Sequence, residues 1–253
     1  MPPDIPSITI LSVPMVSLSL DAALTEIGQL LAGDKPSMVA FANAHTLNLA
    51  IADPAFRDVL CRAELVCNDG IGVSMAARLR GLRFPANLNG TDLSPRILRI
   101  AARQGAPVFF LGGAAGIAAV AAERLNRIIP GLIVAGTADG YADLADLPRL
   151  LNTIRSSQAK LLFVGLGNPR QELWLAEHLA DTGATVGIGV GAFLDFAASR
   201  VRSAPAWMRA ARIEWLFRLA LEPRRLFRRY VTGNPLFLYR VARERIASPG
   251  RGA

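Results

Sequence analysis

Short apolar runs alternate with helix-like patterns along residues 36–190. Near-continuous apolar strands separated by helices are typical of a parallel sheet that is covered on both faces. Helix start signals lie between the runs: Asp53 precedes Pro54, Thr91 precedes a periodic apolar run, and Pro169 opens another helix. The pattern predicts an α/β fold with a mostly parallel sheet, whose strands lie at residues 38–42, 65–68, 107–111, 132–135, 161–165 and 185–190.

The pattern changes after residue 195. Pro205 begins an arginine-rich helical stretch over residues 206–221, Pro223 interrupts it, and a second stretch follows. Pro235 then precedes a third helical stretch. The sequence therefore predicts an α/β core over residues 1–200 and a basic, helical appendage over residues 201–253.

Charge is concentrated in this second part. The 253 residues carry a formal net charge of +8, and residues 200–245 alone hold twelve arginines and three glutamates, a net charge of +9. Such a basic segment suits an anionic membrane surface or nucleic acid. Aromatic and apolar side chains recur there at helical spacing beside arginines, which favours a helix lying in a membrane interface over a core helix with solvated arginines. These side chains are Trp207, Met208, Ala211, Trp215 and Leu219.

The composition also indicates the class of protein and its cellular compartment. With 52% hydrophobic and 19% charged residues the chain is not a disordered protein. Cys61 and Cys67 are expected to be buried free thiols of a reducing compartment. The uncharged residues 5–20 follow no basic segment, and residues 105–122 contain proline and several glycines, so neither is expected to be a secretory signal or a membrane span. We expect a cytoplasmic protein.

Polar or glycine-rich clusters follow several of the expected strands. Ligands of doubly wound sheets bind beyond the carboxyl ends of the strands, where these clusters fall. Asp69 follows an apolar strand directly, so its carboxylate is our candidate for a catalytic base, although an aspartate before Gly70 also suits a turn or an N-cap. The other clusters start at Asn43, Gly112, Gly167 and Gly189.

Two of these clusters allow alternative interpretations. Residues 112–116 could offer backbone N–H groups to a phosphate, or form a packing turn. Gln171 and Arg170 could grip a nucleotide or sugar, or simply form an exposed helix start. The sequence contains no Asp-x-Asp motif and no histidine pair spaced for zinc, so we expect no metal cofactor.

Taken together, the motifs resemble the WecG/TagA/CpsF family of bacterial glycosyltransferases, glycosyltransferase family 26. The resemblance extends over residues 8–240 and includes residues 110–113, 189–195, 204–208, 214–219 and 222–230. Its shorter motifs are Asn68-Asp69-Gly70, Asn89-Gly90-Thr91-Asp92, Asp139-Gly140-Tyr141 and Gly167-Asn168-Pro169-Arg170-Gln171-Glu172.

The resemblance implies a Rossmann-like core and an appendage that docks on the membrane and completes the active site. It implies an inverting, metal-independent transfer of a sugar from a UDP-sugar donor to a polyprenyl-diphosphate-linked saccharide, in surface or exopolysaccharide assembly. The enzyme would need no cofactor and would sit on the inner face of the cytoplasmic membrane; a homo-oligomer is compatible with this. Asp69 would be the base, and the expected substrate contacts are Asn43, Asn68, Thr91, Gly112, Gly113, Tyr141, Gln171, Arg218, Arg225 and Arg228.

Two positions depart from the family pattern. Phe41 stands where members commonly have threonine, and Asn87 where they have arginine. Both departures concern the choice of sugar, and UDP-glucose and UDP-N-acetylmannosamine are the donors we consider first.

Two other functional classes make different predictions. A non-catalytic nucleotide-binding module tethered to membranes would not require Asp69. A nucleic-acid-binding protein would show steeply salt-dependent binding of oligonucleotides, but no RNA or DNA module accompanies the basic segment, so we expect no nucleic-acid partner.

Overall fold

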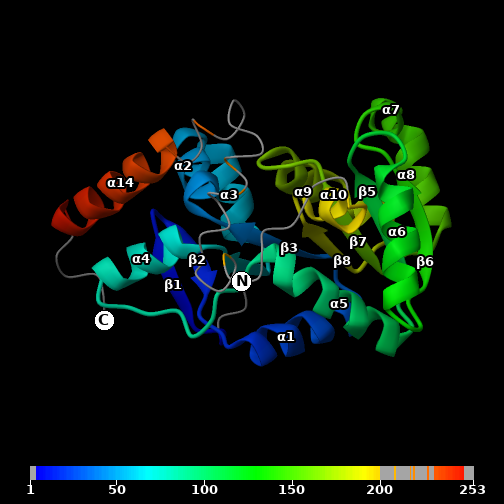
Figure 1. Ribbon diagram of the computed structural model, residues 1–253, viewed down its shortest axis with the longest axis horizontal. Coiled ribbons are helices and arrows are strands. Elements are labelled where there is room, and N and C mark those ends of the chain that lie inside the picture. The colour runs from blue at the N-terminus through cyan, green and yellow to red at the C-terminus, as the bar shows by residue number, and fades with distance from the viewer. Residues whose placement is uncertain are drawn as a thin grey trace.

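The computed structural model describes residues 4–199 and 231–247, together with the single residues Met208, Phe217, Leu219 and Phe227. Its centre is a six-stranded sheet in which every neighbouring pair of strands is parallel, in the order β4-β3-β8-β7-β5-β6 (Figure 1). The α/β architecture predicted from the apolar pattern is therefore confirmed. The strands are β3 (Ser37–Ala42), β4 (Leu65–Asn68), β5 (Val108–Gly112), β6 (Val134–Ala138), β7 (Leu161–Gly165) and β8 (Val186–Gly189).

Five of these strands coincide with the predicted runs to within one residue at each end, and β6 does not. We predicted residues 132–135, whereas β6 covers Val134–Ala138. Leu132 is buried against the core before the strand begins, so it contributed an apolar signal from outside the strand. The strand itself lies at the edge of the sheet and is mostly half-buried, so its own residues give a weak pattern.

Successive side chains of β3, β4, β5 and β7 enter two different hydrophobic clusters, one on each face of the sheet. In β3, for example, Ala40 joins the first cluster and Phe41 the second. The first face carries α2 (Ala44–Ala52), α3 (Pro54–Arg62), α8 (Leu147–Ser156) and α9 (Arg170–Thr182). The second face carries α1 (Leu20–Ala32), α5 (Gly90–Gln104), α6 (Ile117–Ile128) and α10 (Phe193–Ala197).

The helix starts follow the local signals in the sequence. The Asp53 carboxylate accepts hydrogen bonds from the N–H groups of Ala55 and Phe56 and so caps α3. Pro169 directly precedes α9, as predicted. Helix α5 begins one residue before Thr91, because the side chain of Asn89 provides its N-cap.

A hairpin at the N-terminus was not predicted. It consists of β1 (Ser7–Ile10) and β2 (Val13–Val16), joined by Leu11 and Ser12, which have positive φ angles of 50° and 65°. Hairpin turns of this kind usually carry glycine or asparagine, so this sequence gives no turn signal. The hairpin packs against β4, α3 and α4 (Ile71–Leu79).

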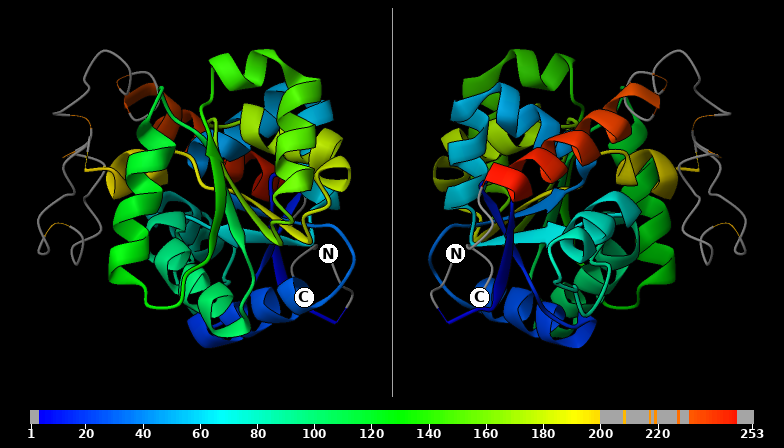
Figure 2. Two further views of the ribbon diagram at one scale, coloured as in Figure 1. Left: turned by 90° about the vertical axis from the view of Figure 1, so that its right-hand side faces the viewer. Right: turned by 90° about the vertical axis from the view of Figure 1, so that its left-hand side faces the viewer.

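Helix α14 (Gly233–Ala247) matches the third helical stretch expected near Pro235. Phe237 and Val241 are fully buried in the same cluster as the hairpin, and α14 packs on α2 and α4 (Figure 2). Oε2 of Glu244 accepts a hydrogen bond from the N–H of Leu11 at 3.3 Å. Thus α14 packs on helices of the first face and belongs to the hydrophobic cluster on that side of the sheet.

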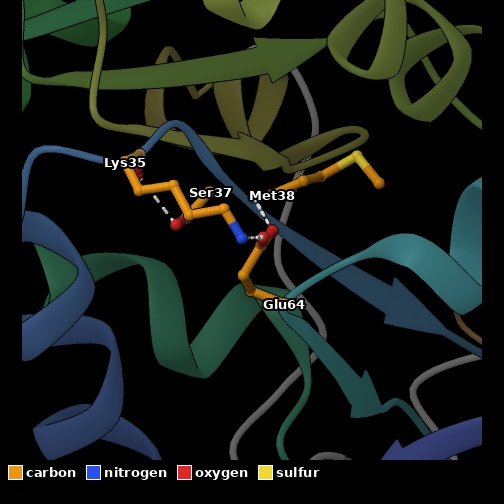
Figure 3. A network of polar contacts seen from close by, with 4 residues as sticks. All are labelled: Lys35, Ser37, Met38 and Glu64. Atoms are coloured by element: carbon orange, nitrogen blue, oxygen red, sulfur yellow. Dashed lines mark hydrogen bonds and ion pairs between the residues drawn. The ribbon is translucent and has the colours of Figure 1, made fainter. Parts of the chain in front are cut away.

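Figure 3 shows how the N-terminal ends of β3 and β4 are fixed to each other. Glu64 directly precedes β4, and its Oε2 accepts a hydrogen bond from the N–H of Met38 at 2.8 Å. Its Oε1 lies 3.2 Å from Nζ of Lys35, just before β3. These contacts hold the two strands in register, which in turn places the residues at their carboxyl ends. Across the described ranges, no helix is both long and apolar enough to span a bilayer.

Candidate functional site

The chain leaves β3 and β8 toward opposite faces of the sheet. The helix after β3 is α2, which packs on the first face, and the helix after β8 is α10, which packs on the second. Since β3 and β8 are neighbours, this is a topological switch point, where open α/β sheets bind their ligands. The candidate site is therefore the edge formed by the carboxyl ends of β4, β3, β8 and β7.

Asn43 and Asp69 meet at this edge. Asn43 follows β3 and Asp69 follows β4, and Nδ2 of Asn43 donates to Oδ2 of Asp69 at 3.4 Å. Oδ1 of Asn43 accepts hydrogen bonds from the N–H groups of His45 and Thr46, so the same side chain caps α2. The backbone N–H of Asp69 donates to the carbonyl of Ala42 at 2.9 Å. Both candidate residues are half-buried and held from two sides.

The Asp69 carboxylate does not cap the helix that follows it. The N-cap of α4 is Gly70, with φ +94°, and no side chain caps this helix. The N–H of Gly70 instead donates to Oδ1 of Asn87 at 2.8 Å. The N-cap alternative for Asp69 is thus not what the structure shows, and Asn87 has a defined task in shaping the Asp69 loop.

Asn68 is fully buried beneath this loop. Its Nδ2 donates to the carbonyl of Ala86 at 2.9 Å, and its backbone carbonyl accepts from the N–H of Leu88 at 3.0 Å. These bonds hold the segment that carries Asn87. The observed contacts of Asn68 therefore position the loop from inside the protein.

Phe41 brings the start of α5 to the same edge. Its ring is almost entirely buried, and a Cβ atom added at Gly90 would lie 3.1 Å from it, so this helix start leaves little room for a side chain other than hydrogen. Thr91 is the second residue of α5 and is half-buried. The helix start with Thr91 is thus packed on Phe41, near the end of β3.

Gln171 is buried at 2% exposure in the first turn of α9 and ties two loops together. Its Oε1 accepts from the N–H of Gly167, after β7, at 3.1 Å and from the N–H of Gly191, after β8, at 2.9 Å. The exposed-helix-start interpretation is therefore wrong for Gln171, while Arg170 beside it is exposed. Gln171 fixes the shape of the edge next to β3.

Glu172 was not singled out from the sequence. It is fully buried, and its Oε1 accepts from Nε2 of Gln171 at 2.8 Å and from Nδ2 of Asn168 at 2.6 Å. Burial raises the pKa of Glu172 to about 7, against a smaller opposing effect of the Gln171 hydrogen bond. Buried carboxylates are rare, so composition and spacing gave no reason to expect this one.

The glycines after β5 are required by close packing. Gly112 has φ +134°, and a Cβ there would lie 2.5 Å from the carbonyl oxygen of Gly165; at Gly113 it would lie 2.7 Å from Ile117. These contacts fit the packing-turn interpretation. Tyr141 follows β6 and is 69% exposed. Five strand spacings, about 24 Å, separate β6 from β4, so the sheet does not bring Tyr141 to Asp69.

The cysteine prediction is confirmed in part. Both thiols are free, but Cys67 is buried whereas Cys61 is half-buried. Burial, with a smaller contribution from the Asp69 charge, raises the pKa of Cys67 to about 12. The thiol beneath the Asp69 loop therefore stays protonated.

Three predicted contacts, Arg218, Arg225 and Arg228, lie outside the described residues, as do Trp207 and Trp215. Two surface hollows of about 530 Å³ and 910 Å³ lie elsewhere, one between α1 and α5 and one at the amino ends of the strands. None of the predicted site residues lines either hollow.

Comparison with known proteins agrees with the resemblance seen in the sequence. The model of the glycosyl transferase WecG/TagA/CpsF family matches residues 8–251. A Bacillus spizizenii protein named N-acetylglucosaminyldiphosphoundecaprenol N-acetyl-beta-D-mannosaminyltransferase is 31% identical over 192 residues, covering 76% of this chain and 74% of its own. Proteins of the same name from Bacillus subtilis and Staphylococcus aureus are 28% and 29% identical, covering 74% and 81% of this chain and 72% and 79% of theirs.

Proposed function

Because the chain belongs to the WecG/TagA/CpsF family of glycosyl transferases, we propose that it moves a sugar from a UDP-sugar to a polyprenyl-diphosphate-linked saccharide with inversion at the anomeric carbon. The observation that carries this proposal is the Asp69 carboxylate, held by Asn43 at the switch point of the sheet. A half-buried carboxylate at this position suits a general base for an incoming hydroxyl group.

In the proposed reaction, Asp69 takes the proton of one acceptor hydroxyl group. The freed oxygen forms a bond to the anomeric carbon of the donor from the side opposite UDP. The bond between that carbon and the UDP oxygen breaks, and its electron pair stays on the diphosphate. One glycosidic bond replaces another, the proton resides on Asp69, and attack from the opposite side inverts the anomeric carbon.

The remaining predicted residues take two kinds of role in this proposal. Asn43 and Thr91 face the reacting groups at the end of β3. Asn68, Asn87 and Gln171 act through the backbone that they hold. Direct contacts of the donor with Gly112, Gly113 and Tyr141 remain predictions from the family pattern, as do the contacts of Arg218, Arg225 and Arg228 with the diphosphate.

For the donor we propose UDP-N-acetylmannosamine first and UDP-glucose second. The names of the relatives describe transfer of N-acetylmannosamine to N-acetylglucosaminyldiphosphoundecaprenol. Phe41 fills the place of the threonine common in the family and is buried against Gly90, so it offers no hydroxyl group to a donor. Such an acceptor is held in a lipid bilayer, and we propose that the working enzyme binds the inner face of the cytoplasmic membrane.

The experiment incubates the purified chain with a panel of UDP-sugars and polyprenyl-diphosphate-linked N-acetylglucosamine, and identifies the lipid-linked product and its anomeric configuration. We expect one β-linked product from one donor. Asp69→Asn should slow its formation by about 10²–10⁴-fold, whereas Asp34→Asn, exposed at the opposite edge of the sheet, should not. A chain that binds UDP but forms no product with any donor would instead support the non-catalytic module. An Asp69→Asn variant that forms product at the parent rate would show that Asp69 is not the base.

A further inference from the structure

Helix α4 carries an apolar stripe on its outer face. Ile71, Met75 and Leu79 are 40%, 42% and 42% exposed and are spaced four residues apart, so they lie on one side of the helix. Val73, Ala76 and Ala77 point the other way and are buried in the core. We call Ile71, Met75 and Leu79 the α4 stripe. It is about 13 Å long.

Exposed apolar side chains continue on the neighbouring helix. Leu236 and Tyr239 of α14 are 44% and 63% exposed, while Phe237 and Val241 anchor this helix to the core. Both helices lie on one side of the molecule, at the left in Figure 1 and facing the viewer in the right-hand view of Figure 2. Exposed apolar side chains thus occur on both of these packed helices.

The charges beside this surface have one predominant sign. Residues 70–88 contain three arginines and no acidic residue, and residues 231–247 contain three arginines and one glutamate. That glutamate, Glu244, is engaged with Arg80 at 3.4 Å. Arg78, Arg83 and Arg243 are exposed. An apolar stripe bordered by exposed arginines is complementary to an anionic bilayer, with hydrocarbon beneath a negative surface.

The stripe also starts at the candidate base. Ile71 is two residues from Asp69, and only Gly70 separates the base from α4. A bilayer in contact with α4 would therefore lie close to the carboxyl edge of the sheet. This arrangement would let the sugar of an acceptor reach Asp69 while its polyprenyl chain stays in the membrane.

We propose that the α4 stripe is a bilayer-contacting surface for anionic lipid, in addition to the basic appendage. The role that it gives to the lipid-linked acceptor rests on the proposed function, whereas binding of the stripe to vesicles does not. Exposed apolar side chains elsewhere provide a matched control. Val120, Ile128 and Ile133 are 40%, 64% and 46% exposed, and α6, which carries the first two, lies at the opposite end of the molecule (Figure 1).

The test compares full-length chains carrying Ile71→Ser, Met75→Ser and Leu79→Ser with chains carrying Val120→Ser, Ile128→Ser and Ile133→Ser. Co-sedimentation is measured with vesicles of phosphatidylcholine containing phosphatidylglycerol, and with vesicles of phosphatidylcholine alone. No donor or acceptor is present, so failure of the proposed function cannot affect the result. Thermal unfolding of each variant is measured without vesicles.

We expect the α4 variant to lose at least tenfold in partitioning to the anionic vesicles, while the control variant partitions like the parent chain. The two variants should lose similar, small amounts of Tm, because serine packs less well than the side chains that it replaces. Equal partitioning of the α4 variant and the parent would overturn the proposal. So would a Tm of the α4 variant far below that of the control variant, because it would show that another part of the chain covers the stripe. Equal binding of the parent to both kinds of vesicle would overturn the assignment to anionic lipid.

Discussion

The side chain of Asn43 joins the end of β3 to the candidate base: its Oδ1 caps α2, while its Nδ2 donates to Oδ2 of Asp69 at 3.4 Å. One residue thus fixes both a helix and the orientation of a carboxylate. Because the two ends of the amide have different tasks, substitutions can separate them.

Asp69→Asn should lower kcat by about 10²–10⁴, because the amide keeps the shape of the side chain but cannot accept the acceptor's proton. The affinity for UDP, measured by calorimetry, should stay near that of the parent. Asp34→Asn serves as the control for a lost surface charge. Turnover of Asp69→Asn near the parent rate would show that another group acts as the base.

Asn43→Asp keeps an oxygen that can cap α2 but removes the donor to Asp69 and places a second carboxylate beside it. We expect this variant to fold with a Tm close to that of the parent and to lose turnover. Asn43→Ala loses the cap as well, at a cost of about 1 kcal/mol in the free energy of unfolding. If both variants turned over at the parent rate, the contact with Asp69 would have no part in the reaction.

Gln171→Ala should destabilise the protein by about 2–3 kcal/mol, because it leaves the N–H groups of Gly167 and Gly191 without their acceptor. The KM for the donor should rise as the two loops lose their connection. Urea unfolding and steady-state kinetics measure the two effects. Gln29→Ala, at an exposed position of α1, should change neither.

Glu172 should make stability fall as the pH rises from about 4.5 to about 7. Below this window the carboxyl group is protonated in both states; within it, the unfolded chain ionises while the raised pKa of about 7 keeps the folded carboxyl group neutral. The loss is on the order of 3 kcal/mol. Urea unfolding at several pH values measures it. Glu172→Gln can still accept both hydrogen bonds and should abolish this part of the pH dependence. An unchanged profile would show that the pKa of Glu172 is the same in the folded and unfolded chain.

Arg225→Ala should lower turnover by about 10²-fold if its guanidinium stabilises the departing diphosphate. Binding to anionic vesicles should change little, because only one of many positive charges is lost. Arg62→Ala is the control, since it removes one positive charge from an exposed position of α3. Removing all residues after Val201 should abolish vesicle binding and transfer together. It would also remove α14 and expose the core around Phe237, so the single substitution is the cleaner test.

Most strands could be predicted because they are buried on both faces of the sheet. Nearly every residue of such a strand is therefore apolar, and the strand appears in the sequence as a continuous apolar run. The exception is β6, where Leu132 shifted the apparent start and the edge position weakened the pattern. The hairpin was not predicted because its turn residues, Leu11 and Ser12, have positive φ angles. Such angles are usually adopted by glycine or asparagine, and the sequence has neither there.

The candidate site could be predicted in part. Carboxyl ends of parallel strands meet at one edge, so Asn43 and Asp69 could be expected to lie near each other. The order of the strands could not be read from the chain, and this order sets Tyr141 far from Asp69. The burial of Gln171 and Glu172 depends on loops after β7 and β8 that come together only in the folded sheet.

Helix α14 has a consequence for how the protein is synthesised. All six strands of the parallel sheet precede α14 in the chain, as does every described residue of the candidate site. These segments therefore leave the ribosome before α14. Until Phe237 arrives, the apolar surface between α2 and α4 has no cover, and the N–H of Leu11 has no partner in Glu244. A nascent chain therefore presents this open surface beside the α4 stripe. We expect chaperones or the membrane itself to meet the protein first on that side, before the fold is closed.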